Sequence, residues 1–317
     1  MEQSIPVVDL GDFTGGTPAQ RDNFIQTLGD ALSDLGFFAL ENHQVDEALI
    51  LRSYDIVADF FRLDEAAKSQ YIDPNGMGQR GYTAFATEHA KDHAAPDLKE
   101  FWHVGQELPA GHPLLGVYGT NIWPSEIAEF KAVLLTLFRS LEHCAQSLLR
   151  ALALYLGEPE NLFADMIVEG DTILRTIHYP PVPDDADPAS VRASAHEDVN
   201  LITILCESTA PGLELLQRDG IWRPIHALKG QFVVDSGDML QHVTNGRIRS
   251  TTHRVTNPDN SRDQRFSMPF FVHPRPEVDL TPLSKSVAAT GGEAKFNSLS
   301  AREFLEQRLE EIGLKKS

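Results

Sequence analysis

Residues 171 to 272 alternate between short apolar runs, rich in β-branched and aromatic residues, and turn sequences. We expect eight strands, at 172–179, 201–206, 213–217, 220–225, 232–234, 239–243, 248–255 and 264–272. Pro-Pro, Pro-Gly, Ser-Gly-Asp, Asn-Gly and Asn-Pro sequences lie between them, and these residues favour the backbone angles that turns require. Many short strands with frequent turns are typical of a jelly roll built from two sheets.

The first half of the chain has a helical pattern instead. Residues 17–20 form a capping box with proline at the first helical position, and Gly36 is placed to end that helix. A longer apolar stripe predicts a helix over 124–156, and a shorter helix is expected over 298–314. Short strands are expected at 5–10 and 37–40, and a second helix over 46–71 with a break near residues 63–64. A loop is expected at 73–95, before the segment 97–104.

These helices need a sheet to cover, so we expect one α+β unit over residues 1–317. Its predicted parts are a mainly helical layer (1–165), a jelly-roll or double-stranded β-helix core (170–280) and a closing C-terminal segment (281–317).

A possible metal site is present at His196 and Asp198. On an extended backbone these two side chains point to the same side, while Glu197 points away. Two histidines and one carboxylate form the facial triad that binds non-haem Fe(II) with open positions. His253, in another β-branched run, is the candidate third ligand, although a lone histidine on a strand is more often a core residue. His178, His226 and His242 are rival ligands, and we interpret them as structural.

Arg265 and Ser267 are also two residues apart on an expected strand, so a guanidinium and a hydroxyl share one face. This pair suits the binding of a carboxylate beside the metal. Arg265 opens an apolar run, and a buried arginine needs an anion, although a surface ion pair would also account for it.

The charge balance argues against two classes of partner. The chain has 46 acidic and 27 basic residues, a net charge of −19, which repels nucleic acid and anionic membranes. It has two cysteines and no apolar N-terminal or membrane-spanning run, so a cytoplasmic protein is expected. The sequence does not indicate an oligomeric state.

The order His-x-Asp, distant His, Arg-x-Ser resembles the isopenicillin N synthase-like family of Fe(II)- and 2-oxoglutarate-dependent dioxygenases. The similarity extends to residues 5–10, 36–43, 97–101, 238–240 and 244–246. It implies a metal-binding oxidoreductase with His196, Asp198 and His253 as catalytic iron ligands. Fe(II), 2-oxoglutarate and O2 would be used to hydroxylate, desaturate or cyclise a small molecule, with release of succinate and CO2.

The resemblance also implies further contacts. Arg265 and Ser267 would hold the far carboxylate of 2-oxoglutarate, and Tyr179 matches a tyrosine that reaches the co-substrate or substrate carboxylate. The substrate candidates are Gln79, Tyr82 and Thr83, with Phe271 and the C-terminal helix as a wall and lid.

Ile177 departs from the asparagine that many members of the family have at this position. Two alternatives therefore stay open: an oxidase that works without 2-oxoglutarate, as isopenicillin N synthase does, and an inactive jelly-roll binding protein.

Overall fold

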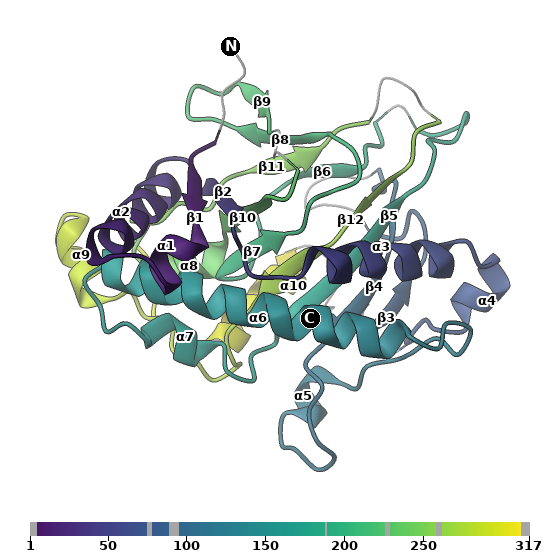
Figure 1. The fold of residues 1–317 in the computed structure, drawn as a ribbon, viewed down its shortest axis with the longest axis horizontal. Coiled ribbons are helices and arrows are strands. Elements are labelled where there is room, and N and C mark those ends of the chain that lie inside the picture. Colours follow the sequence, from purple (N-terminus) through teal and green to yellow (C-terminus); the bar gives the residue numbers. More distant parts are fainter. Residues whose placement is uncertain are drawn as a thin grey trace.

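The structure is a computed structural model that describes residues 5–74, 78–88, 95–187, 189–225, 229–257 and 262–311. Its centre is two β-sheets that face each other (Figure 1). In the larger sheet the order is β1-β2-β10-β7-β13-β5-β4-β3, and β12 also pairs with β5. These strands are β1 (Val7–Asp9), β2 (Phe37–Glu41), β3 (Gly81–Thr83), β4 (Glu100–Gly105), β5 (Ile173–Tyr179), β7 (Ile202–Leu205), β10 (Phe232–Ser236), β12 (Arg265–Ser267) and β13 (Pro269–Val272).

The smaller sheet has the order β6-β11-β8-β9. Its strands are β6 (Ala193–His196), β8 (Leu213–Leu216), β9 (Trp222–Pro224) and β11 (His253–Val255). Apolar side chains of both sheets form one buried cluster, which includes Ala39 and Val233 from the larger sheet and Leu215 and Val255 from the smaller. The two sheets therefore enclose a common interior, and the expected α+β fold with a double-stranded β-helix core is confirmed.

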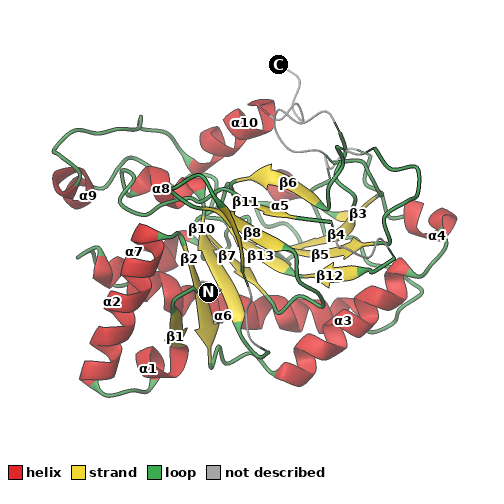
Figure 2. Ribbon diagram, turned by 90° about the horizontal axis from the view of Figure 1, so that it is seen from above, coloured by secondary structure: helices red, strands yellow, loops and turns green. Residues whose placement is uncertain are grey.

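The two sheets are flanked by helices (Figure 1 and Figure 2). They are α1 (Leu10–Thr14), α2 (Pro18–Asp34), α3 (Glu47–Phe61), α4 (Glu65–Ser69), α5 (Leu115–Tyr118), α6 (Phe130–Tyr155), α7 (Leu162–Met166), α8 (Asp238–Val243), α9 (Ser284–Ala289) and α10 (Ala301–Glu311). Figure 2 shows α3 and α6 along one side of the strands. On the apolar side of α6, Leu134, Leu141 and Leu148 are buried in the main core, because they recur at helical spacing. None of the helices in the described ranges is long and apolar enough to cross a membrane.

The start of α2 follows the sequence closely. Thr17 and Gln20 form the predicted capping box, with Pro18 in the first turn. Gly36, at φ +77°, ends the helix, and its N–H donates to the carbonyl of Ala31 at 3.0 Å. Both ends of the helix were therefore predictable from local residues.

Four expected elements differ from the structure. Residues 239–243 form helix α8 rather than a strand, because Met239, Leu240 and Val243 are buried at helical spacing. The strand expected over 248–255 shortens to His253–Val255, since the N–H of Ser250 bonds to the Gln241 side chain rather than to a neighbouring strand. The long helix begins at Phe130, not at residue 124, and 264–272 is divided into β12 and β13.

Candidate functional site

Three ligand-type side chains converge at the edge of the smaller sheet. His196 ends β6 and His253 begins β11, and the two residues are directly paired across the strands. Asp198 follows β6 by two residues, and its Oδ1 lies 3.7 Å from His196 Nε2 and 3.8 Å from His253 Nε2. One ligand atom from each of the three residues lies within 4.8 Å of the others. The strand pairing has thus brought together residues that are far apart in the sequence.

Both imidazoles are oriented by their own backbone. His196 Nδ1 donates to the carbonyl of Ser194 at 2.7 Å, and His253 Nδ1 donates to the carbonyl of Thr251 at 3.1 Å. Each Nε2 therefore carries a lone pair and faces Asp198. This is the arrangement in which a histidine binds a metal through one ring nitrogen while the other holds the ring in place.

Asp198 is held on one side only. Thr203 Oγ1 donates to its Oδ2, and Asn200 Nδ2 donates to Thr203 Oγ1 at 2.8 Å. Asp235 lies beside Thr203 on the neighbouring strand, and its burial, together with the nearby Asp198, raises the pKa of its carboxyl well above the usual value. Asp198 Oδ1 is thereby left as the oxygen directed at the two imidazoles.

A glycine underlies the loop that carries Asp198. The N–H of Gly237 donates to the carbonyl of Leu201 at 3.0 Å, and that of Asp238 donates to the carbonyl of Asp198 at 2.7 Å. A Cβ at Gly237 would lie 2.3 Å from the carbonyl oxygen of Asn200. Only a residue without a side chain fits beneath this loop, which explains the Ser-Gly-Asp sequence there.

The chemistry of the triad suits a divalent transition metal. Burial, and then the neighbouring His253, lower the pKa of His196 to about 4, so its imidazole is neutral at physiological pH, the form that binds metal. About a third of the His196 side chain is exposed, at 37%, whereas Asp198 and His253 are buried. Two imidazoles and one carboxyl group on one side of a site leave positions open on the other, as Fe(II) oxygenases require.

A second group of predicted residues lies along the inner face of the larger sheet. Arg265 and Ser267, on β12, pair with Tyr179 and Ile177 on β5. Arg265 is 1% exposed, and its Cζ lies 5.0 Å from the centre of the Tyr179 ring. Arg265 Nε donates to the carbonyl of Ala210 at 3.0 Å, while NH1 is buried without a hydrogen-bond partner. Among the described residues, no carboxylate forms an ion pair with Arg265.

The predicted substrate residues fall on two faces of the sheet. Thr83 pairs with Phe101, and Phe101 with Ile177, which in turn pairs with Ser267. Residues paired directly across neighbouring strands lie on the same face, so Thr83 shares the face of Ser267 and Arg265. Its hydroxyl is buried and unpartnered. Phe271 pairs with Thr203, the residue that bonds to Asp198, so it also belongs to this face. Gln79 precedes β3 and is half-buried; of the expected substrate loop, residues 75–77 lie outside the described ranges.

Tyr82 does not belong with them. Side chains alternate along a strand, so Tyr82 points to the outer, helix-covered face. Its ring is 1% exposed and packs against Phe60 at 5.7 Å between ring centres, and its hydroxyl donates to Glu100 at 2.5 Å. The expectation that Tyr82 contacts substrate is therefore wrong, and the residue belongs to the core.

A network of charged side chains lies close to His196. We call Glu88, Asp97, Lys99, His103 and Arg175 the paired-charge cluster. Lys99 Nζ lies 2.8 Å from Asp97 and 3.0 Å from Glu88, and Arg175 lies 3.2 Å from Glu88. Asp97 also accepts hydrogen bonds from the N–H and Oγ of Ser194, whose carbonyl holds His196. The cluster thus supports the strand that carries a triad residue, and each of its cations has a carboxylate partner.

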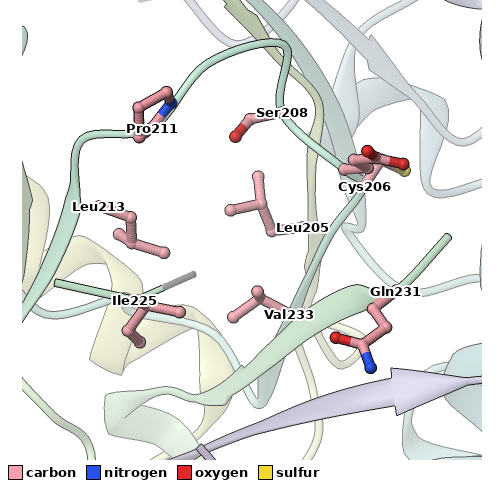
Figure 3. A pocket seen from close by; sticks show the side chains of 9 residues that line it. Leu205, Cys206, Ser208, Pro211, Leu213, Ile225, Gln231 and Val233 are labelled. Carbon is pink, nitrogen blue, oxygen red and sulfur yellow. The ribbon is translucent and has the colours of Figure 1, made fainter. Parts of the chain in front are cut away.

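Neither of two pockets found elsewhere is lined by the triad. The first, about 40 Å³ in volume, lies between the sheets and is lined by Leu205, Leu213, Ile225 and Val233, among others (Figure 3). A space of that size holds about one or two water molecules and no substrate. The second, about 570 Å³, is an open groove between the start of α3 and the segments around Ser208 and Gly230.

The remaining histidines have other roles where the structure describes them. His178 Nδ1 lies 2.7 Å from Glu100, and His242 Nε2 donates to the carbonyl of Asn297 at 2.7 Å. His226 lies outside the described residues.

The sequence analysis missed Thr203 and Asp235, which reach the site through strand pairing, and Arg192, which lies just before β6. The one available signal was Arg192, a charged residue beside the small side chains of β6.

Comparisons with known proteins agree with this geometry. Residues 5–126 match the family described as "non-haem dioxygenase in morphine synthesis N-terminal", and residues 170–274 match the "2OG-Fe(II) oxygenase superfamily". The 2-oxoglutarate-Fe(II) type oxidoreductase hxnY of Emericella nidulans is 31% identical over 86% of this chain and 80% of its own length.

Two solved structures have the same fold. A 2OG-Fe(II) oxygenase family protein from Caulobacter crescentus superposes with a TM-score of 0.87 and 38% identity, covering 97% of this chain and 99% of its own. A full-length protein from Neurospora crassa, solved in complex with alpha-KG and thymine, has a TM-score of 0.86 and 27% identity, with 96% of each chain covered. The chain belongs to the 2OG-Fe(II) oxygenase superfamily, in its isopenicillin N synthase-like family, and is an Fe(II)- and 2-oxoglutarate-dependent oxidoreductase.

Proposed function

We propose that His196, Asp198 and His253 hold the Fe(II) of this oxygenase. The observation that carries the proposal is the convergence of two Nε2 lone pairs and one carboxylate oxygen, each fixed by a hydrogen bond on its far side. Such fixed donors are typical of a preformed metal site, because no side chain has to move when the ion binds. Three protein ligands leave room for a chelating co-substrate and for O2.

The co-substrate, in this proposal, lies between the triad and Arg265. Arg265 and Ser267 bind the far carboxylate of 2-oxoglutarate, and the Tyr179 ring packs against the Arg265 guanidinium. The buried NH1 of Arg265 supports this role, because an unpaired buried cation is costly and a carboxylate would satisfy it. Ile177 adds an apolar surface beside Phe101 and Tyr179.

When bound, the iron and 2-oxoglutarate together activate O2, so that 2-oxoglutarate becomes succinate and CO2 while a substrate is oxidised. The protein supplies the orientation of these groups and keeps water out of the site. We propose that the substrate is a small molecule held over the inner face near Phe271 and Thr83, with Gln79 at the rim. The Thr83 hydroxyl, buried without a partner, is available to bind a polar group of that substrate.

The proposal is tested by binding, without turnover. Anaerobic protein is loaded with Fe(II), and 2-oxoglutarate is added while the visible spectrum is recorded. We expect a metal-to-ligand charge-transfer band that saturates with one co-substrate per iron and is missing from Asp198→Ala. A wild-type protein that binds iron but never develops this band would contradict the co-substrate assignment.

The alternative expected from Ile177, an oxidase without 2-oxoglutarate, is not supported by the family matches. An oxidase that uses no 2-oxoglutarate would bind the carboxylate of its own substrate at Arg265 and Ser267. In that case no charge-transfer band forms with 2-oxoglutarate, and no succinate appears during turnover.

A further inference from the structure

A second buried arginine lies at the Arg265 end of the site. Arg192 precedes β6, and only 1% of its surface is exposed. Its Cζ lies 5.9 Å from the centre of the Tyr179 ring, the same ring that Arg265 approaches to 5.0 Å. Two guanidinium groups, one on β12 and one just before β6, thus lie close to the same tyrosine ring.

The contacts of Arg192 within the protein leave part of its guanidinium unused. One nitrogen, NH2, donates to the backbone carbonyl of Asp263. Nε is buried and has no hydrogen-bond partner. No carboxylate of the described residues lies within ion-pair distance of Arg192. The Asp263 carboxylate acts on it only as a nearby charge.

This arrangement is unfavourable without an anion. Burial lowers the pKa of Arg192 and the positive charge of Arg265 lowers it further, which means that both effects oppose the charged form. Arginine nevertheless stays protonated in proteins, so two like charges share a poorly solvated space. Buried charges are normally paired, and a carboxylate placed between two guanidinium groups would satisfy both.

We propose that Arg192 is a second carboxylate-binding residue for 2-oxoglutarate, acting beside Arg265. This inference rests on the proposed function, since it assigns the far carboxylate to the same end of the site. Arg192 and Arg265 would both bind this carboxylate, so the site would select strongly for a 2-oxo acid that ends in a carboxylate.

A purely structural role is the competing explanation. Arg192 could serve only to hold the Asp263 carbonyl, and so fix Arg265 two residues later. In that case its loss would act through Arg265 and would have no effect once Arg265 had been removed. The two roles therefore predict different results in a double variant.

The experiment measures co-substrate binding to the anaerobic Fe(II) protein by its charge-transfer band. Two ligands are compared: 2-oxoglutarate, and 2-oxopentanoate, which has the same chain length and a methyl group in place of the far carboxylate. The variants are Arg192→Gln, Arg192→Lys and Arg265→Gln, with the double variant of Arg192→Gln and Arg265→Gln. Arg247→Gln is the matched control, because Arg247 also lies over a tyrosine ring, Tyr155, and donates only to backbone carbonyls.

We expect Arg192→Gln to weaken 2-oxoglutarate binding about tenfold or more, as for the loss of a charge-assisted contact, with 2-oxopentanoate binding unchanged. Arg192→Lys should recover part of the loss, and Arg247→Gln should have no effect. The double variant should bind 2-oxoglutarate more weakly than Arg265→Gln alone.

Three results would overturn the inference: an unchanged affinity in Arg192→Gln, an equal loss for both ligands, or no further loss in the double variant. If the wild-type protein itself binds no 2-oxoglutarate, the proposed function fails together with the inference. If it binds and Arg192→Gln binds equally well, only the inference fails.

Discussion

Two regions of the site each contain two largely buried cations, and they differ in how those cations are neutralised. In the paired-charge cluster, Lys99 and Arg175 are matched by carboxylates of the protein, with Asp97 and Glu88 at 2.8 to 3.2 Å. At the other end, the acceptors of Arg192 and Arg265 among the described residues are backbone carbonyls. The first region is complete without a ligand, and the second is not.

The difference separates scaffold from binding site. A buried cation that is paired with a carboxylate of the protein has a structural role. A buried cation without such a partner favours the binding of an anionic ligand. Charge alone would not have distinguished the two regions, because both hold two basic residues. Partner geometry does distinguish them.

The largest effect is expected at the triad. Replacing His196, Asp198 or His253 singly with alanine removes one of three ligands, so stoichiometric iron binding and turnover should be lost. Iron content after desalting measures this, and circular dichroism checks that the fold persists. His143→Ala, an exposed histidine on α6, is the control. A variant that retains full iron affinity would remove its residue from the triad.

The next effect separates the two kinds of cation. Arg265→Gln should weaken 2-oxoglutarate binding by about ten- to a hundredfold, because a charge-assisted contact contributes about 1.5–3 kcal/mol. Arg175→Gln should leave that affinity unchanged, since its charge is already matched by Glu88. The 2-oxoglutarate affinity of both variants is measured by anaerobic titration. An equal loss of affinity in the two variants would show that the two regions do not differ in carboxylate binding.

Changes in the paired-charge cluster should alter the free energy of unfolding and not the affinity for 2-oxoglutarate. Burial opposes ionisation of Glu88, but Arg175 and Lys99 outweigh it and lower the pKa of its carboxyl below the ordinary value. A lowered folded-state pKa stabilises the protein above the unfolded pKa of about 4.3, and this contribution is lost as the pH falls below it.

Glu88→Gln should therefore reduce the free energy of unfolding at pH 7 by about 1–3 kcal/mol, with 2-oxoglutarate affinity unchanged. Below the unfolded pKa the difference from wild type should shrink. Urea unfolding at several pH values measures it. A constant difference across that range would contradict the assigned charge state of Glu88.

The smallest effect concerns the two faces of β3. Thr83→Val removes one hydroxyl on the inner face, so we expect a higher substrate KM and more 2-oxoglutarate consumed per product, with co-substrate affinity intact. Tyr82→Phe removes a hydroxyl that bonds to Glu100 on the outer face, and should lower stability without changing coupling. The ratio of succinate to product tests both. A change in the ratio of succinate to product in Tyr82→Phe alone would contradict the assignment of Thr83 to the inner face and Tyr82 to the outer face.

Short-range signals made much of this predictable. The capping box of α2, Gly36, and the spacing of His196 and Asp198 are local patterns whose geometry follows from one element. The strand prediction for 239–243 was wrong because the apolar residues of so short a run fit both the strand period and the helix period. The prediction that Tyr82 contacts substrate was wrong because the resemblance identified the segment, but not the face of the sheet on which the Tyr82 side chain lies.

Long-range features were out of reach. Thr203 and Asp235 reach the site through strand pairing, and Arg192 reaches it from the segment before β6. Nothing in their sequence neighbourhood indicates a partner. The matched state of Lys99 and the unmatched state of Arg192 could likewise be distinguished only once the strands were assembled.

The central claim is that the unmatched guanidinium end of the site binds the far carboxylate of 2-oxoglutarate. It is tested most directly by titrating anaerobic Fe(II) wild-type protein and Arg265→Gln with 2-oxoglutarate and 2-oxopentanoate. We predict that wild type prefers the dicarboxylate by about tenfold or more, and that the preference largely disappears in Arg265→Gln. Equal affinity of the wild-type protein for the two ligands would contradict the account.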